Sequence, residues 1–188
     1  MSTTQPIRDP KDVCALIDHY HNLGHHRNHR LIVFGLFTAL RISDLLPLRW
    51  GDVYDFKHNR AHTTLTLKEQ KTGKQKSLAL NSKIANALKY SIHTAKPYEY
   101  LFANSLTGKP ICRAQAYRII KDAGESVNLP TPISCHSLRK TFGYHAWKSG
   151  VSPAIIMEIF NHSSLHHTRR YLGINQDDLD AAYSVINF

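Results

Sequence analysis

The sequence predicts an α+β fold that is mainly α-helical and contains a small antiparallel β-sheet. Segments with apolar residues at helical spacing occupy both ends of the chain, and the stretch from 53 to 80 alternates polar and apolar residues around a glycine. No repeat, linker or low-complexity tract divides the 188 residues, of which 42% are hydrophobic. A chain of this length and composition is expected to fold as one domain.

The first predicted helix begins at Pro10. Asp9 is a suitable N-cap, proline is favoured at the first helical position, and apolar residues that include Leu16 and Tyr20 follow on one face. The polar break "GHHRNH" comes next. Its histidines are interpreted as polar loop residues near DNA: His25, His26 and His29.

Residues 29–39 are apolar nearly all round, which predicts a buried helix. In "RISDLLPLRW", residues 41–50, Ser43 is expected to cap a short helix that Pro47 ends or distorts. Arg41 lies at this junction, beside the predicted core.

Two strands are predicted at 53–56 and 61–67. The segment "EQKTGKQ" then reverses the chain into "KSLAL", which places Gly73 in a hairpin turn. Gly150 suits the end of one later helix, and the pair Ser152–Pro153 suits the start of the next. These later helices are predicted at 82–94, 113–124, 135–149, 153–160 and 164–171, with a last one near 177–185.

Lysine and arginine outnumber aspartate and glutamate by 24 to 14, which gives a formal net charge of +10 at pH 7. The corresponding pI is near 9.6. A small domain with this balance is expected to bind a polyanion, most often a nucleic acid. The charge by itself identifies no site.

The cysteines and the N-terminus indicate an intracellular protein. Cys14, Cys112 and Cys135 show no metal-ligand spacing and are expected to be small buried thiols in a reducing compartment. The opening "MSTTQPIRDPK" lacks the apolar core of a targeting signal. The longest apolar run, 31–40, is about half the length that spans a bilayer. We therefore expect no membrane segment and a cytoplasmic protein.

The stretch "SCHSLRKTFGYHAWKSG", residues 134–150, places His136 and Arg139 at the start of a predicted helix. A helix N-terminus carries partial positive charge, so cationic side chains there favour an anionic partner. Backbone N–H groups, an imidazole and a guanidinium that converge are typical of a phosphate site. Taken alone, the pair is more often part of a solvated helix face.

Four segments follow one another along the chain: "TALRISDLLPLRWGDV", "KTGK", "HSLRKTFGYHAWKSG" and "NHSSLHHTRRYLGI". Their order and spacing resemble those of the tyrosine recombinase or phage integrase family, over residues 10–180. Each motif is weak alone, whereas the ordered set is specific. The resemblance implies the tyrosine recombinase catalytic-domain fold. It places the catalytic residue types of the family at Arg41, Lys71, His136, Arg139, His162 and Tyr171.

The resemblance implies a catalytic domain that breaks and rejoins DNA with no ATP, metal or other cofactor. Attack on a phosphodiester gathers negative charge on its oxygens, so fixed cations are the main requirement. Arg41 and Arg139 are expected to clamp the phosphate, because a planar guanidinium matches two oxygens at once. Tyr171 is expected to be the nucleophile that forms a 3'-phosphotyrosyl link and releases a 5'-hydroxyl.

Proton transfer is assigned on the same basis. His136 is expected to accept the phenolic proton, and His162 to donate a hydrogen bond to the phosphate. Lys71 belongs to a hairpin that can lie along the minor groove and is expected to protonate the leaving 5'-oxygen. Lys74 and Lys76 remain alternatives for this acid.

Asp44 is expected to act behind the catalytic residues, as an acceptor that orients them. For single residues, other interpretations remain open. Arg41 could simply pair with Asp44 on a surface helix, "KTGK" could be an ordinary basic hairpin, and Tyr171 could be a core aromatic residue.

The 13 histidines raise the alternative of a zinc site. The spacing of one histidine group suits zinc, but no glutamate or cysteine lies at a supporting position, and no metal is expected. That group consists of His162, His166 and His167.

Two features depart from the family pattern. The residue before the second active-site histidine is usually glycine, whereas here it is Asn161, which tolerates positive backbone angles better than most residues. Arg41 lies too early in the chain to leave room for the N-terminal core-binding domain of many members. The protein therefore resembles the short recombinases such as the fimbrial phase-switch invertases, with a single catalytic domain expected over 1–188. A segment cut from a longer chain is the alternative.

Within this domain the expected core covers 10–176, and a tail helix covers 177–188. The tail carries Leu179, Ala182, Tyr183 and Ile186 at helical spacing. In the family such a tail often packs on a neighbouring protomer; packing on its own domain is the alternative.

The predicted function is site-specific DNA recombination, with integration, excision or inversion as the outcome. A DNA-binding regulator that no longer cuts and a type IB-like topoisomerase are the alternatives. The expected partners are double-stranded DNA with inverted-repeat sites, further copies of the chain in a homotetramer on DNA, and accessory DNA-bending factors. Free of DNA, a monomer or weak oligomer is expected.

We further expect a bacterial or phage-encoded protein associated with the nucleoid. Besides Lys74 and Lys76, candidate DNA contacts come from two predicted helices: Arg113, Gln115, Arg118 and Lys140.

Overall fold

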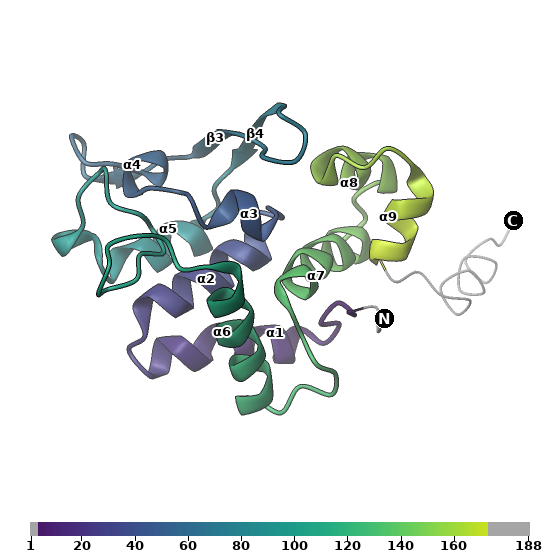
Figure 1. Cartoon of the computed structure of the whole chain (residues 1–188). Coiled ribbons are helices and arrows are strands. Elements are labelled where there is room, and N and C mark those ends of the chain that lie inside the picture. The colour runs from purple at the N-terminus through teal and green to yellow at the C-terminus, as the bar shows by residue number, and fades with distance from the viewer. Residues whose placement is uncertain (1–3, 173–188) are drawn as a thin grey trace, which may run out of the picture.

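The structure, a computed structural model, describes residues 4–172 (Figure 1). It is mainly helical with small antiparallel strand pairs, which confirms the predicted fold class. The predicted helix near 177–185 lies outside the described residues. The elements are α1 (Pro10–Asn22), α2 (His26–Phe37), α3 (Ile42–Leu45), α4 (Trp50–Val53), β1 (Tyr54–Asp55), β2 (Arg60–Ala61), β3 (Thr64–Lys68), β4 (Gln75–Ala79), α5 (Ser82–Lys89), the 3₁₀ helix η1 (Ile92–Thr94), α6 (Arg113–Ser126), α7 (Cys135–Lys148), α8 (Pro153–Phe160) and α9 (Leu165–Leu172).

Helix α1 begins as predicted. The Asp9 side chain accepts a hydrogen bond from the backbone N–H of Lys11 at 2.8 Å, and Pro10 occupies the first turn. Leu16 and Tyr20 are buried, and the Tyr20 hydroxyl donates to the carbonyl of Ile119 in α6 at 2.9 Å. The N-terminal helix is therefore fastened to the middle of the chain.

The expected loop at "GHHRNH" is wrong for most of its length, because α2 begins at His26. His29 is only 7% exposed, and its Nδ1 lies 3.0 Å from the carbonyl oxygen of Ile17 in α1. The His26 ring stacks on Tyr90 with centroids 5.3 Å apart. These contacts with distant segments stabilise a polar first turn that looks like a loop in the sequence.

The expected cap at Ser43 is also wrong. Helix α3 starts at Ile42 with Arg41 as its N-cap residue, so Ser43 lies inside the helix. It ends at Leu45, before Pro47, as predicted. The short helix α4, which follows, was not predicted.

The strands form two antiparallel pairs rather than one sheet: β1 pairs with β2, and β3 with β4. The predicted strand 61–67 therefore spans the end of β2 and most of β3. In the second pair the register runs from Thr64 opposite Ala79 to Lys68 opposite Gln75. Gly73 has φ +68° in the connecting turn, a conformation that favours glycine.

The C-terminal helices lie close to their predicted positions. Gly150 follows α7 with φ +87°, and the Ser152 side chain accepts a hydrogen bond from Ala154 N at 3.3 Å. Asn161 ends α8 in the left-handed conformation, with φ +50° and ψ +49°. The turn before His162 is therefore formed with asparagine in place of glycine.

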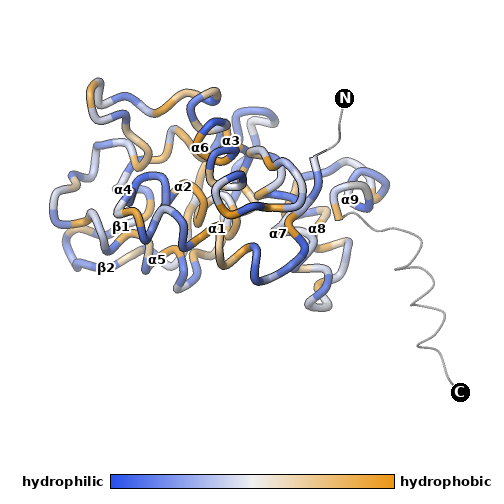
Figure 2. The backbone as a smooth tube through the Cα atoms, turned by 90° about the horizontal axis from the view of Figure 1, so that it is seen from below, coloured by the Kyte–Doolittle hydropathy of each residue, from blue (hydrophilic) through white to orange (hydrophobic). Residues whose placement is uncertain are grey.

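Two hydrophobic clusters build the interior. The larger one surrounds α2, which packs on α1, α5 and α7, and Figure 2 shows apolar segments near α2 in the middle of the molecule. The smaller cluster joins the carboxyl end of α2 to α8 and α9 through Ala39, Ile156, Phe160 and Leu172. Figure 1 shows α7, α8 and α9 together on one side of the molecule.

The cysteines were wrongly expected to be buried: Cys14 and Cys112 are exposed, and Cys135 is partly buried. Each of them is a free thiol. Within residues 4–172, no helix is both long and apolar enough to cross a membrane.

Candidate active site

One open cavity of about 860 Å³ brings together residues from distant parts of the chain. Its lining comes from the start of α3, the β3–β4 turn, the first residue of α6, the first turns of α7, the α8–α9 connection and α9. The six residues that the resemblance singles out all line it: Arg41, Lys71, His136, Arg139, His162 and Tyr171.

Arg139 is the most deeply buried of these, with 2% of its surface exposed. Its guanidinium donates to the carbonyl of Ala39 and, at 2.7 Å, to that of Phe160. Its Cζ also lies 4.6 Å from the centroid of the Phe160 ring. Burial, followed by the nearby charge of Arg41, lowers the pKa of Arg139 to about 10, so it remains cationic at neutral pH.

Arg41 lies beside it and shares the same carbonyl. Its Nη2 donates to the Phe160 oxygen at 3.3 Å, and its Nη1 donates to Oε1 of Glu69 at 2.9 Å. The ion-pair partner of Arg41 is thus Glu69 and not Asp44. The open alternative of an Arg41–Asp44 surface pair is wrong.

The carboxyl end of α8 collects positive side chains. The Phe160 carbonyl accepts from both arginines, and the Ile159 carbonyl accepts from Nζ of Lys76. The last carbonyls of a helix carry partial negative charge and have no partner within the helix. They therefore help to hold cations side by side that would otherwise repel one another.

Tyr171 packs on the smaller hydrophobic cluster and also reaches the cavity. Its ring centroid lies 4.8 Å from that of His162 and 5.4 Å from that of Phe160. Nζ of Lys140 lies 5.2 Å from the tyrosine ring centroid. The residue is only partly buried, unlike a fully enclosed core aromatic.

Two of the histidines that line the cavity, His136 and His162, differ in their surroundings. Nδ1 of His162 lies 3.1 Å from Oγ1 of Thr168, and burial, followed by the charges of Arg139 and Arg41, lowers its pKa to about 4. His136 is more exposed; burial of part of its ring and the same type of repulsion also lower its pKa. Both imidazoles are neutral at neutral pH in this arrangement.

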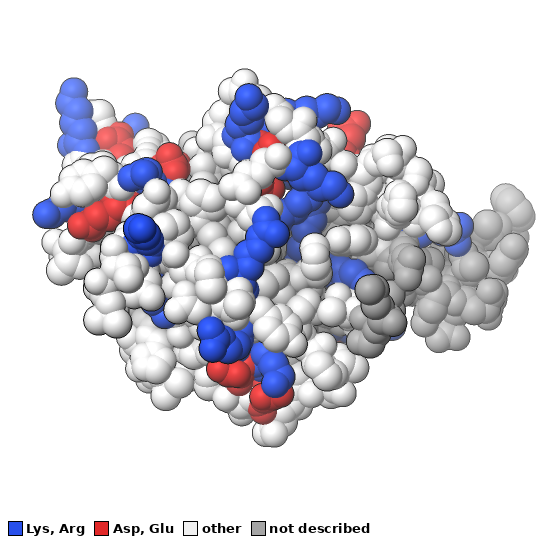
Figure 3. Space-filling model, viewed as in Figure 1, with Lys and Arg blue, Asp and Glu red and all other residues white. Residues whose placement is uncertain are grey.

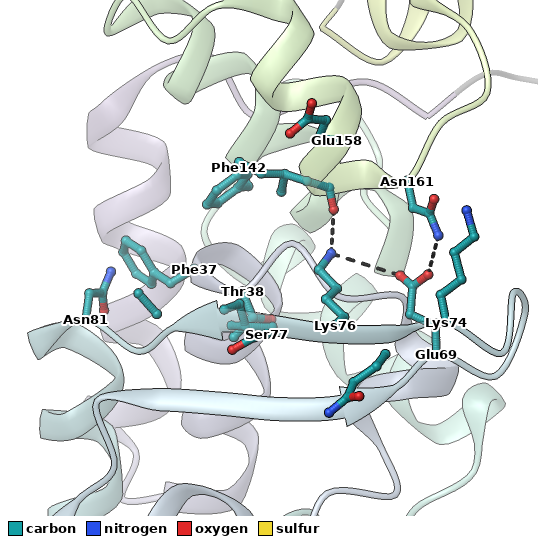
Figure 4. Close-up of a pocket in the computed structure, with 14 residues that line it drawn as sticks. Phe37, Thr38, Glu69, Lys74, Lys76, Ser77, Asn81, Phe142, Glu158 and Asn161 are labelled. Carbon is teal, nitrogen blue, oxygen red and sulfur yellow. Dashed lines mark hydrogen bonds and ion pairs between the residues drawn. The ribbon is translucent and has the colours of Figure 1, made fainter.

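The structure separates the lysines of the hairpin. Lys71 lines the cavity of about 860 Å³, whereas Lys74 and Lys76 line a neighbouring hollow of about 670 Å³. Figure 4 shows Lys76 pointing from β4 toward the end of α8 and toward Glu69. Burial lowers the pKa of Lys76 to about 8.

Asp44 contacts the turn that carries Lys71. Its Oδ1 accepts a hydrogen bond from the backbone N–H of Gln70 at 2.8 Å, and the residue is 4% exposed. The buried carboxylate thus holds the residue that precedes Lys71.

Sequence reasoning missed Glu69. Only 2% of it is exposed, and its carboxylate contacts Arg41, Lys76, Thr72 and Asn161. The available signal was its charge: it is the one acidic residue in the basic stretch "KEQKTGKQKS".

The candidate DNA-contact residues differ in their exposure and in their hydrogen-bond partners. Arg113 lines the cavity and Arg118 is exposed, whereas the side-chain oxygen of Gln115 accepts from Cys112 N at 3.1 Å and caps α6. Lys140 is 8% exposed and donates to the carbonyl of Thr4 at 2.6 Å, and its DNA contact stays a prediction. Figure 3 shows lysine and arginine side chains gathered over the middle of the face viewed in Figure 1.

A metal site is not formed by the described part of the chain. Residues 4–172 hold no group of three histidine, cysteine, aspartate or glutamate side chains placed to bind an ion. The rings of His162 and His167 are 6.5 Å apart, and those of His166 and His167 are 6.1 Å apart.

Comparison with known proteins agrees with this geometry. The family model described as "Phage integrase family" matches residues 8–177. The chain is similar to a "Probable integrase/recombinase YoeC" of Bacillus subtilis (strain 168), with 38% identity over 185 residues that cover 98% of each protein. It is also 27% identical, over 175 residues, to a "Tyrosine recombinase" of Pseudothermotoga lettingae, which covers 92% of this chain and 58% of that protein.

A solved structure shares the fold. The XerH site-specific recombinase, bound to a palindromic difH substrate in a post-cleavage complex, matches with a TM-score of 0.74 at 19% identity. The match covers 98% of this chain and 54% of that chain. The described helices and strands therefore have the catalytic-domain fold of tyrosine recombinases.

Proposed function

This chain belongs to the phage integrase family, and from this premise we propose that it is a site-specific DNA recombinase that cuts and rejoins strands through a phosphotyrosyl intermediate. The observation that carries the proposal is the convergence of the six motif residues on one open cavity. These six are two arginines, a lysine, two histidines and a tyrosine, and the set suits a phosphodiester because its positive charge offsets the negative charge of the reacting phosphate.

In the first step the Tyr171 hydroxyl attacks the phosphorus, and the bond from phosphorus to the 5'-oxygen breaks. Arg41 and Arg139 hold the non-bridging oxygens. Their shared contact with the Phe160 carbonyl supports this role, because it places both guanidinium groups at one point before DNA arrives. The phosphate remains joined to Tyr171, so the energy of the broken bond is stored.

Two protons move during this step. The phenolic proton passes to His136, and the 5'-oxygen receives a proton from Lys71, the hairpin lysine that lines the cavity. Rejoining reverses both transfers: the 5'-hydroxyl attacks the phosphotyrosyl phosphorus and Tyr171 leaves. His162 donates a hydrogen bond to the phosphate, for which the Thr168 hydroxyl beside Nδ1 leaves Nε2 available.

The proposal includes assembly. We infer a catalytic domain that acts as a tetramer on paired inverted repeats in double-stranded DNA. The basic surface in Figure 3 and the net charge of +10 support DNA as the partner.

A search of the DNA beside the gene for inverted repeats supplies the substrate, and a nicked duplex that carries such repeats tests the reaction. When the strand is nicked next to the cleavage point, the short 5'-hydroxyl fragment diffuses away and the covalent complex accumulates. We expect an SDS-resistant protein–DNA adduct with the wild-type protein and none with Tyr171→Phe, because the variant lacks the attacking oxygen.

Tyr117→Phe is the matched control, since Tyr117 is 46% exposed on α6 and does not line the cavity; this variant should form the adduct at the wild-type rate. A duplex that is bound specifically but gives no adduct would contradict the proposal and favour a regulator. An adduct without strand exchange would favour a topoisomerase.

A further inference from the structure

Glu69 is a buried carboxylate that joins three parts of the site. Its Oε1 accepts from Nη1 of Arg41 at 2.9 Å and lies 4.0 Å from Nζ of Lys76. Its Oε2 accepts from the Thr72 hydroxyl and from Nδ2 of Asn161, each at 2.8 Å. Only 1% of the side chain is exposed, and a buried charge is stable only when it is paired and hydrogen-bonded in this way.

Asn161 supplies the link to α8. Its backbone adopts the left-handed conformation that ends this helix, and its side chain donates to Glu69 and, at 3.3 Å, to the Thr72 hydroxyl. Glycine would adopt the same backbone angles at lower cost but has no side chain to make these bonds. The side chain of Asn161, the residue directly before His162, therefore ties the end of α8 to the β3–β4 hairpin (Figure 4).

The turn that carries Lys71 is held at its base as well. The N–H of Glu69 donates to the carbonyl of Lys74 at 2.9 Å, and the N–H of Gly73 donates to the carbonyl of Glu69 at 2.8 Å. Asp44 accepts from the N–H of Gln70 on the side that faces α3. On the side that faces α8, the Glu69–Asn161 bond attaches the turn itself, while Lys76 attaches β4 through the Ile159 carbonyl.

We propose that Glu69 and Asn161 form a positioning pair, which fastens the hairpin to the carboxyl end of α8 and so holds Arg41, Lys71 and His162 in one arrangement around the phosphate. Neither residue of the pair takes part in bond making or proton transfer. The inference rests on the proposed function of the cavity, because it names which residues keep that cavity in its reactive form.

Exchange of the two functional groups tests the pair. Asn161→Asp places two carboxylates where a hydrogen bond of 2.8 Å was, and Glu69→Gln removes the charge that Arg41 and Lys76 contact. In the double variant E69Q/N161D, the glutamine amide can donate to the new carboxylate across the same gap, and the total charge is restored.

We expect the rate of DNA cleavage at saturating protein to fall about 100-fold in Asn161→Asp. The double variant should cleave DNA about tenfold faster than Asn161→Asp. The affinity for DNA should stay within about threefold, because the pair does not contact the phosphate. A double variant that is no faster than Asn161→Asp, or single variants that cut at the wild-type rate, would overturn the proposal.

Tryptic cleavage after Lys71 and Lys74 in the native protein gives a readout that needs no recombination. We expect trypsin to cut Glu69→Gln and Asn161→Gly about five times faster in this turn, because the turn loses its attachment to Asn161 at the end of α8. Asn161→Gly keeps the left-handed turn and should therefore fold. If trypsin cuts the turn of Asn161→Gly at the wild-type rate, the result would contradict the role of the pair.

Glu125→Gln makes the same substitution at an exposed position on α6, where Glu125 contacts Lys121 at 3.3 Å, and should resemble the wild type in both assays.

The two proposals fail in different ways. If the wild type gives no adduct but the tryptic pattern is as expected, the proposed function is wrong and the positioning pair remains. If the adduct forms and the tryptic pattern does not change, the pair is wrong alone.

Discussion

His162 is held as a neutral imidazole although it lies in a cavity that must bind an anion. Burial lowers its pKa from 6.5 to about 4, and the positive charges of Arg139 and Arg41 act in the same direction. A bound phosphate brings negative charge to the same place and raises this pKa again. Binding of DNA and protonation of His162 are therefore expected to favour each other.

This low pKa predicts how stability depends on pH. Between pH 6.5 and about pH 4 the unfolded chain binds a proton at residue 162 that the folded chain does not bind. The free energy of unfolding should therefore fall as the pH falls through this window, by roughly 1–2 kcal/mol from His162 after allowance for its partial exposure.

Urea unfolding of the wild type and of His162→Asn at about pH 7 and about pH 4.5 measures this contribution. The variant should lose less stability between the two conditions. The pKa values of His136 and His29 are also lowered, but both proteins share these groups, so their effect cancels in the difference. Equal losses in the two proteins would contradict the assignment.

At the scale of elements, close packing of α7 on α8 and α9 sets the position of the nucleophile. A Cβ atom at Gly143 in α7 would lie 2.7 Å from Cζ of Phe160 and 3.2 Å from Cδ2 of Leu172. Phe160 is fully buried and its ring cannot move aside easily. Glycine at 143 therefore allows α8, which ends just before His162, and α9, which carries Tyr171, to approach α7.

Gly143→Ala should push α8 and α9 away from α7. We expect the cleavage rate to fall more than about tenfold, because a shift of about 1 Å misplaces the attacking oxygen. The free energy of unfolding should fall by about 1–2 kcal/mol, since overpacking outweighs the better helix propensity of alanine. Adduct formation and urea unfolding measure the two effects.

Gly124→Ala is the matched control on α6. A Cβ atom there would lie 2.7 Å from Cγ1 of Ile133, which is a similar clash. Helix α6 packs mainly on α1, α2 and α7. We expect a comparable loss of stability with a cleavage rate within about threefold of the wild type. A cleavage rate that falls equally in both variants would attribute the effect to general destabilisation.

At the scale of the whole molecule, the cavity borders the smaller hydrophobic cluster, which joins the end of α2 to α8 and α9 and also contacts Tyr171. Arg139 in α7 connects these segments, because it donates to the carbonyl of Ala39 after α2 and to that of Phe160 at the end of α8. A buried cation at this junction links the packing of these helices to assembly of the phosphate site. The excess of positive charge over the whole surface then attracts DNA to this junction.

The net charge of +10 predicts DNA affinity that falls steeply with salt. Arg113 is exposed and lines the cavity, so Arg113→Ala should reduce the slope of log K against log salt by about 1. Titrations of a labelled duplex over a range of salt concentrations measure the slope.

Lys121→Ala removes one charge from the same helix and serves as the control. Lys121 pairs with Glu125 and does not line the cavity, so its removal should leave the slope unchanged. Equal slopes for Arg113→Ala and the wild type would show that Arg113 contacts no phosphate.

Much of the fold was predictable because its causes are local in the chain. The Asp9–Pro10 start of α1, the turn at Gly73 and the Ser152–Pro153 start of α8 each depend on residues one to three positions apart. The motif residues were identifiable for the same reason, since each stands in a short segment with a recognisable pattern. Sequence by itself thus determined most of the helices, the hairpin turn and the motif residue types that the cavity holds.

Only the tertiary structure decided what these residues contact. His29 bonds to Ile17 in α1, and Lys140 bonds to Thr4, 136 positions away, so a predicted loop histidine and a predicted DNA contact are both buried. Glu69 joins Arg41 and Asn161, which lie 28 and 92 positions from it. A local pattern cannot reveal such contacts, because the free energy of burying a charge depends on partners that only the folded chain brings near.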